Sequence, residues 1–115
     1  MLRTLLLALP IAVLATGAAA HSDEEATVPA NGATVAEVPM LHMRFDAPMR
    51  IVAATLTTMD GAEVAIERGT GMEPSAEFHA VPAAPLVPGP YRFDWRGMAA
   101  DGHPMQGGFD FTVAE

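Results

Sequence analysis

The chain has 115 residues, no cysteine, and 14 Asp and Glu against 6 Lys and Arg, which gives a formal net charge of -8 at pH 7. That length allows a single domain, and the acidic surface argues against a nucleic-acid partner because it repels phosphate backbones. Without cysteine there is no disulfide scaffold, thiolate metal site or cysteine nucleophile, so any metal would be held by His, carboxylate, Met or backbone groups.

Residues 1–20 have the pattern of a cleavable secretory signal peptide. A short arginine-containing start precedes an apolar run at residues 5–14, and three alanines at residues 18–20 supply a cleavage site. The apolar run is too short, and too closely followed by acidic residues, for a comfortable membrane span. We expect export to the periplasm and a mature domain of residues 21–115. The alternative is an uncleaved membrane anchor, which would leave His21 internal.

Cleavage at that point would make His21 the first residue of the mature chain. The free α-amine and the imidazole of one residue can close a chelate ring on a metal ion. The amine titrates at a pH of about 8 and the imidazole at about 6.5, so both can be made available as neutral donors at physiological pH. An N-terminal histidine alone is weak support for a metal site.

The residues after position 20 have no helical period and form short alternating segments separated by turns rich in Pro and Gly. In chain order, the expected strand segments are residues 27–28, 40–45, 51–58, 62–66, 76–81, 91–96 and 107–113. We expect turns at residues 29–32 and 59–61 and a strand end at residues 46–48, whereas residues 22–25 are too polar for a strand assignment. About seven short strands predict an all-β antiparallel sandwich of the immunoglobulin or cupredoxin type.

Alternation of side chains assigns one face of three strands to the core. The expected core side chains are Leu41, Met43 and Phe45, then Tyr91, Phe93 and Trp95, and finally Phe109, Phe111 and Val113. His42 lies on the opposite face of its strand together with Met40, and His79 alternates with Phe78. We interpret both histidines as partly exposed strand positions.

A carboxylate and an imidazole stand two residues apart in Asp101-Gly102-His103. Side chains two apart on an extended backbone point to the same side and can hold one ion, and Gly102 between them adds no bulk and lets the backbone bend. The alternative is that Asp-Gly forms only a tight turn and that His103 is an ordinary surface residue. Spacing alone favours this alternative.

Adding His21 strengthens the case for a metal site. Two nitrogens from His21, one from His103 and an oxygen from Asp101 would make an N3O donor set, which in a tetragonal plane suits Cu(II). The sequence alone does not show that the two segments meet, because only a fold can bring them together.

Seven of the eight methionines follow residue 20, and they are spread along the chain. Clustered thioethers would indicate Cu(I) or Ag(I), so the spread favours packing roles. Met40 and His42 share a strand face, which would allow a His/Met pair for Cu(I). A partly exposed strand position is the simpler interpretation of both residues.

Several motifs occur together over nearly the whole chain after residue 20. His21 directly follows the leader, and residues 29–32 (Pro-Ala-Asn-Gly) and 41–48 (Leu-His-Met-Arg-Phe-Asp-Ala-Pro) form a turn and a strand. The most specific motifs are Gly-x-Tyr-x-x-x-Trp at residues 89–95 and Asp-x-His-Pro-x-x-Gly at residues 101–107. In these motifs the chain resembles the CopC family of periplasmic copper proteins.

The resemblance implies a Greek-key sandwich or barrel of about seven strands, with one Cu(II) ion held by the amine and imidazole of His21, by Asp101 and by His103. It also implies a non-enzymatic protein of copper homeostasis or resistance, which sequesters copper or delivers it to an inner-membrane transporter such as a CopD-like protein. Family members that bind Cu(I) carry a methionine-rich loop. Residues 57–63 of this chain contain a single methionine, which argues against a Cu(I) site.

Two other function classes stay open at this point. One is a copper enzyme with a histidine brace, but Asp101 would fill a coordination place that oxygen chemistry needs open. The other is an immunoglobulin-like adaptor module without metal, which would be favoured if His21 and His103 lay far apart in the fold. We expect a binding protein and not an enzyme.

Overall fold

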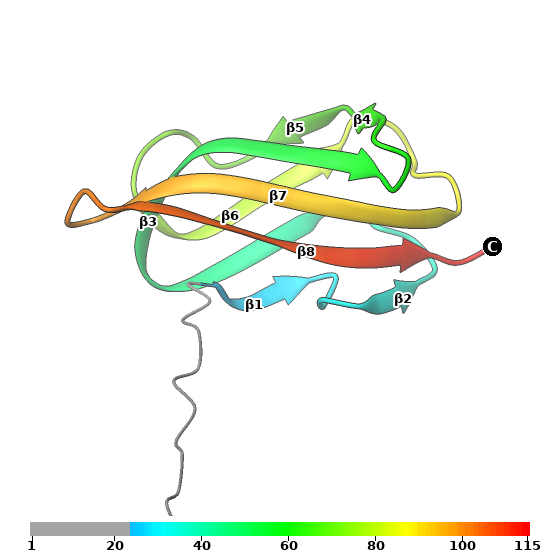
Figure 1. Cartoon of the computed structure of the whole chain (residues 1–115), viewed down its shortest axis with the longest axis horizontal. Coiled ribbons are helices and arrows are strands. Elements are labelled where there is room, and N and C mark those ends of the chain that lie inside the picture. Colours follow the sequence, from blue (N-terminus) through cyan, green and yellow to red (C-terminus); the bar gives the residue numbers. More distant parts are fainter. Residues whose placement is uncertain (1–23) are drawn as a thin grey trace, which may run out of the picture.

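The computed structural model describes residues 24–115, which form eight strands and no helix (Figure 1). The strands are β1 (Glu24–Val28), β2 (Ala33–Val35), β3 (Leu41–Thr58), β4 (Glu63–Val64), β5 (Ile66–Arg68), β6 (Ser75–Pro82), β7 (Gly89–Ala99) and β8 (Pro104–Val113). The expected all-β class is confirmed, with one strand more than the sequence predicted. Residues 24–115 contain no helix that is long and apolar enough to cross a membrane.

β3 is one bent strand that belongs to both halves of the molecule (Figure 1). Up to Phe45 it pairs with β1 and β6, and from Met49 onward it pairs mainly with β7 and, near its end, with β4. The ladder to β6 is irregular between Arg44 and Met49, and residues 46–48 are exposed. The predicted strand end at residues 46–48 is therefore wrong. Pro48 lies at an exposed, irregular bend, where a missing N–H is tolerated.

The strand order is β2-β8-β7-β3-β6-β5, with β1 and β4 also paired to β3. Several neighbours in space are far apart in the sequence, as in the Greek-key sandwich that the resemblance implied. β2 was not predicted, because its three residues carry no readable period; it pairs in parallel with β8. The single strand expected at residues 62–66 is divided into β4 and β5, which pair with different strands.

The predicted core faces are confirmed, because all nine expected side chains are buried. The ring of Phe93 in β7 lies 5.3 Å from that of Phe109 in β8 and 6.3 Å from that of Phe78 in β6, measured between centroids. Because β6 and β8 lie on opposite sides of β3 in the strand order, Phe93 connects the two halves of the molecule.

Tyr91 of β7 stabilises the loop that connects β6 to β7. Its hydroxyl donates a hydrogen bond to the carbonyl oxygen of Val87 at 2.6 Å, and its ring stacks on Phe111 with centroids 5.5 Å apart. A tyrosine bonded to the backbone a few residues upstream is the tyrosine corner of Greek-key sandwiches. The polar end of this buried side chain is thus satisfied by the chain segment that it holds in place.

We expect Tyr91→Phe to lower the free energy of unfolding by about 1 kcal/mol, because the ring stays and one hydrogen bond is lost. For a domain of this size the loss corresponds to a decrease in Tm of roughly 5 °C, which thermal unfolding followed by circular dichroism can measure. An unchanged Tm would show that the bond to Val87 contributes nothing to stability.

Candidate metal centre

The hairpin between β7 and β8 positions two of the predicted metal ligands. The N–H of Ala99 donates to the carbonyl oxygen of His103 at 2.9 Å, and the N–H of Gly102 donates to the carbonyl oxygen of Ala99 at 2.9 Å. Gly102 has a φ of 88°, in the left-handed region that favours glycine. Asp101 and His103 therefore stand on either side of a glycine in a tight turn.

The side chains of Asp101 and His103 meet in this turn. Nδ1 of His103 lies 2.5 Å from Oδ2 of Asp101, and the backbone N–H of His103 donates to Oδ1 at 3.1 Å. The His103 side chain is 76% exposed and the Asp101 side chain 62%. The backbone N–H of His103, followed by its imidazole, lowers the pKa of Asp101 below the ordinary value. The turn thus presents an ionised carboxylate beside an imidazole, both open to solvent.

The third predicted ligand, His21, lies outside the described residues. β1 begins at Glu24, three positions later in the chain, and Glu24 pairs with Phe45 of β3. The hairpin meets β3 on the other side of the bend, because Ala99 pairs with Met49. The start of β1 and the β7–β8 hairpin therefore lie toward the same end of the molecule (Figure 1).

The described residues alone do not make a complete metal site. Within residues 24–115, no group of three or more His, Cys, Asp or Glu side chains is arranged to hold a metal ion. Asp101 and His103 supply one oxygen and one nitrogen. A set of four donors would need a contribution from elsewhere.

The methionines of the described region are spread over the fold, except that Met98 of β7 and Met105 of β8 line one groove. Met43 and Met49 are buried, which confirms the packing role expected of Met43. Exposed methionines are Met40, Met59, Met72 and Met98, which lie before β3, after β3, before β6 and within β7. The turn after β3 holds Met59 as its single methionine. Met98 and Met105 are therefore the pair of methionines that share a groove in the described region, and neither lies in the turn after β3.

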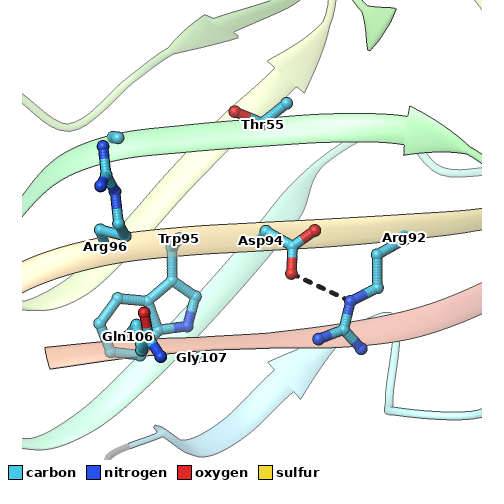
Figure 2. Close-up of a pocket in the computed structure, with 8 residues that line it drawn as sticks. Thr55, Arg92, Asp94, Trp95, Arg96, Gln106 and Gly107 are labelled. Carbon is cyan, nitrogen blue, oxygen red and sulfur yellow. Dashed lines mark hydrogen bonds and ion pairs between the residues drawn. The ribbon is translucent and has the colours of Figure 1, made fainter. Parts of the chain in front are cut away.

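A shallow groove of about 470 Å³ lies over β3, β7 and β8 (Figure 2). The sequence did not single out its polar residues, which include Arg96, Gln106 and the ion-paired Arg92 and Asp94. Nε of Arg92 lies 3.0 Å from Oδ1 of Asp94, and its Nη1 lies 3.3 Å from Oδ1 of Asp110. No histidine is among the lining residues of this groove. Arg92 is thus paired with Asp94 and Asp110 on the sheet surface, and none of the lining residues belongs to the hairpin pair.

The fold and the hairpin define a small Greek-key β-protein that carries an exposed imidazole–carboxylate pair at one end. Residues 25–114 match the CopC domain family. Copper resistance protein C of Escherichia coli is 30% identical over 110 residues, which cover 87% of this chain and 86% of the relative. The chain belongs to the CopC family, as its motifs indicated.

Solved structures show the same fold. PcoC, described as a methionine-rich copper resistance protein from Escherichia coli, superposes with a TM-score of 0.65 at 29% identity, over 82% of this chain and 99% of PcoC. CopC from Methylosinus trichosporium OB3b gives a TM-score of 0.66 at 23% identity, over 82% of this chain and 94% of that protein. The second likeness concerns the fold alone.

Proposed function

We propose that this chain is a periplasmic protein of copper homeostasis or resistance, which holds one Cu(II) ion and is not an enzyme. The observation that carries the proposal is the exposed pair of Asp101 and His103, whose facing atoms lie 2.5 Å apart. Family membership supports the proposal, because the relatives of known name are each called Copper resistance protein C. That name describes copper resistance and not a catalysed reaction.

The proposed donors are the amine and imidazole of His21, the imidazole of His103 and the carboxylate of Asp101. Three nitrogens and one oxygen suit a tetragonal Cu(II) ion, which heads the affinity order of divalent metals. The carboxylate of Asp101 is ionised at neutral pH and needs no deprotonation to bind. The position of the start of β1 supports this donor set, since Glu24 and the hairpin both lie beside the bend of β3, toward one end of the molecule (Figure 1).

The exposure of the pair suits a carrier that takes up and releases its ion. Side chains that are 76% and 62% exposed can meet a partner without any opening of the barrel. In this proposal residues 1–20 are removed as a signal peptide, and the protein sequesters copper or delivers it to an inner-membrane transporter such as a CopD-like protein. We propose no additional Cu(I) site, because the turn after β3 holds a single methionine, Met59.

Isothermal titration of the chain with His21 as its first residue is expected to show tight binding of one Cu(II) ion. Asp101→Asn and His103→Gln should each weaken Cu(II) binding by at least roughly 10- to 100-fold. That is the loss of affinity seen when a residue that only hydrogen-bonds to a metal ligand is removed. Asp60→Asn is the matched control, because Asp60 is also an exposed hairpin aspartate with a lowered pKa. Absence of tight binding, or equal affinities of the parent and His103→Gln, would reject the proposal.

A further inference from the structure

Two histidines are register partners on the outer surface of the sheet, away from the hairpin. His42 of β3 is the register partner of His79 of β6. The N–H of His79 donates to Oγ1 of Thr70, and its carbonyl oxygen accepts from the N–H of Gly69, so both backbone groups point away from β3. His42 and His79 are therefore a non-hydrogen-bonded pair. In such pairs the Cα atoms are about 4.5 Å apart and the side chains are closest.

Glu77 adds a carboxylate to the same face. It precedes His79 by two positions in β6, so both side chains leave the same side of the sheet. Oε1 of Glu77 lies 3.9 Å from Nε2 of His42, whose side chain is 26% exposed. On the other side of His42, its register partner Val28 in β1 is exposed. This row of side chains is therefore open to solvent.

We propose that His42, His79 and Glu77 form a second metal site, which takes a borderline divalent ion such as Cu(II), Zn(II) or Ni(II). Two imidazole nitrogens and one carboxylate oxygen are donors that suit these ions, with water completing the coordination. The site shares no donor with the hairpin. His42 lies seven residues along β3 from Met49, the partner of Ala99, which is up to about 23 Å of extended strand.

In the structure the two rings engage different neighbours. Nδ1 of His79 lies 3.2 Å from Oγ1 of Thr70, and the ring lies against Gly69, which has no Cβ to obstruct it. This is why residues 24–115 contain no group of three such side chains already arranged around one point. Binding requires the His79 side chain to rotate toward His42 and give up its contact with Thr70. The backbone register, which sets the spacing of the pair, stays unchanged.

The test uses the full chain carrying Asp101→Asn and His103→Gln, so that failure of the hairpin site does not affect the outcome. Titration with Zn(II), followed through the imidazole NMR signals, should shift the His42 and His79 signals together and saturate them at one ion. His42→Gln and His79→Gln should each weaken this binding by about tenfold or more. Glu77→Gln should weaken it less, and Glu67→Gln, a nearby exposed glutamate, should leave it unchanged.

Two results would overturn the proposal. One is that Zn(II) leaves the His42 and His79 signals in place. The other is that Zn(II) binding in this background survives when both His42 and His79 are glutamine. Circular dichroism checks that each variant is folded. Thr70→Val keeps both imidazoles and removes the hydroxyl that contacts both the ring and the backbone N–H of His79, so its fold is checked in the same way. It should bind Zn(II) at least as tightly as its parent, and weaker binding would count against the rotation that the site requires.

Discussion

Phe93→Ala is expected to lower the free energy of unfolding by about 3–5 kcal/mol, the range for removal of a buried aromatic ring. Phe93 is fully buried between the rings of Phe109 and Phe78. The cavity would persist, because β7 is held by ladders to β3 on one side and β8 on the other. A small domain is stable by only about 5–15 kcal/mol, so the variant would lose a large share of its stability.

Urea unfolding followed by the fluorescence of the single tryptophan, Trp95, measures this loss. Phe93→Leu keeps much of the apolar volume and should cost less. Val87→Ala is the surface control, because the Val87 side chain is 68% exposed. This substitution should change the free energy of unfolding by no more than about 0.5 kcal/mol. A Phe93→Ala variant that loses less than about 1 kcal/mol would contradict the role of Phe93 as the link between the two halves.

The strand faces could be predicted because side-chain alternation is a local property of the sequence. Tyr91, Phe93 and Trp95 alternate with Arg92 and Asp94, and the former are buried while the latter lie on the outer face as an ion pair. A period of two residues needs only a few positions to be read. Long strands with an apolar face, such as β7 and β8, were therefore the best predicted elements.

Elements that depend on distant partners could not be predicted in the same way. Residues 46–48 are Asp, Ala and Pro, which locally indicate a strand end. The strand continues because Arg44 and Met49 both have partners in β6 and Met49 also pairs with β7. Ala33–Val35 is likewise a strand only because β8 lies beside it. In each case the partner, and not the local sequence, decides the outcome.

The histidines show the same contrast between local and distant information. Asp101 and His103 are only two residues apart in the sequence. The sequence offered a tight turn and a shared side-chain orientation as alternatives, and the structure has both. His42 and His79 come from strands far apart in the chain, so their pairing appears only with the register of β3 and β6. The proposed contribution of His21 stays a prediction of the sequence, because that residue precedes the described region.

A six-residue Gly-Ser extension before His21 is expected to weaken Cu(II) binding by about 100-fold or more. The amine and imidazole of a first-position histidine bind as one chelate, and joining two donors raises their combined affinity by roughly 10²–10⁴. The extension leaves the imidazole in place but converts the backbone nitrogen of His21 into an amide. The same six residues added after Glu115 are the matched control and should leave the affinity unchanged. Competition with a chelator of known affinity measures the Cu(II) affinity of the parent and of both extended proteins.

The pH dependence of binding separates the amine from the other donors. With a native first residue, affinity should rise up to a pH of about 8, because the amine titrates at about 7.7–8.0 and must lose its proton to bind. Asp101 adds no slope in this range, because its pKa lies below the ordinary value of a carboxyl group. The extended chain should therefore show a shallower rise and release fewer protons per bound ion between pH 7 and 8. Equal affinity and equal proton release in both proteins would show that the amine is not a ligand, and the hairpin pair would then need a different source for its remaining donors.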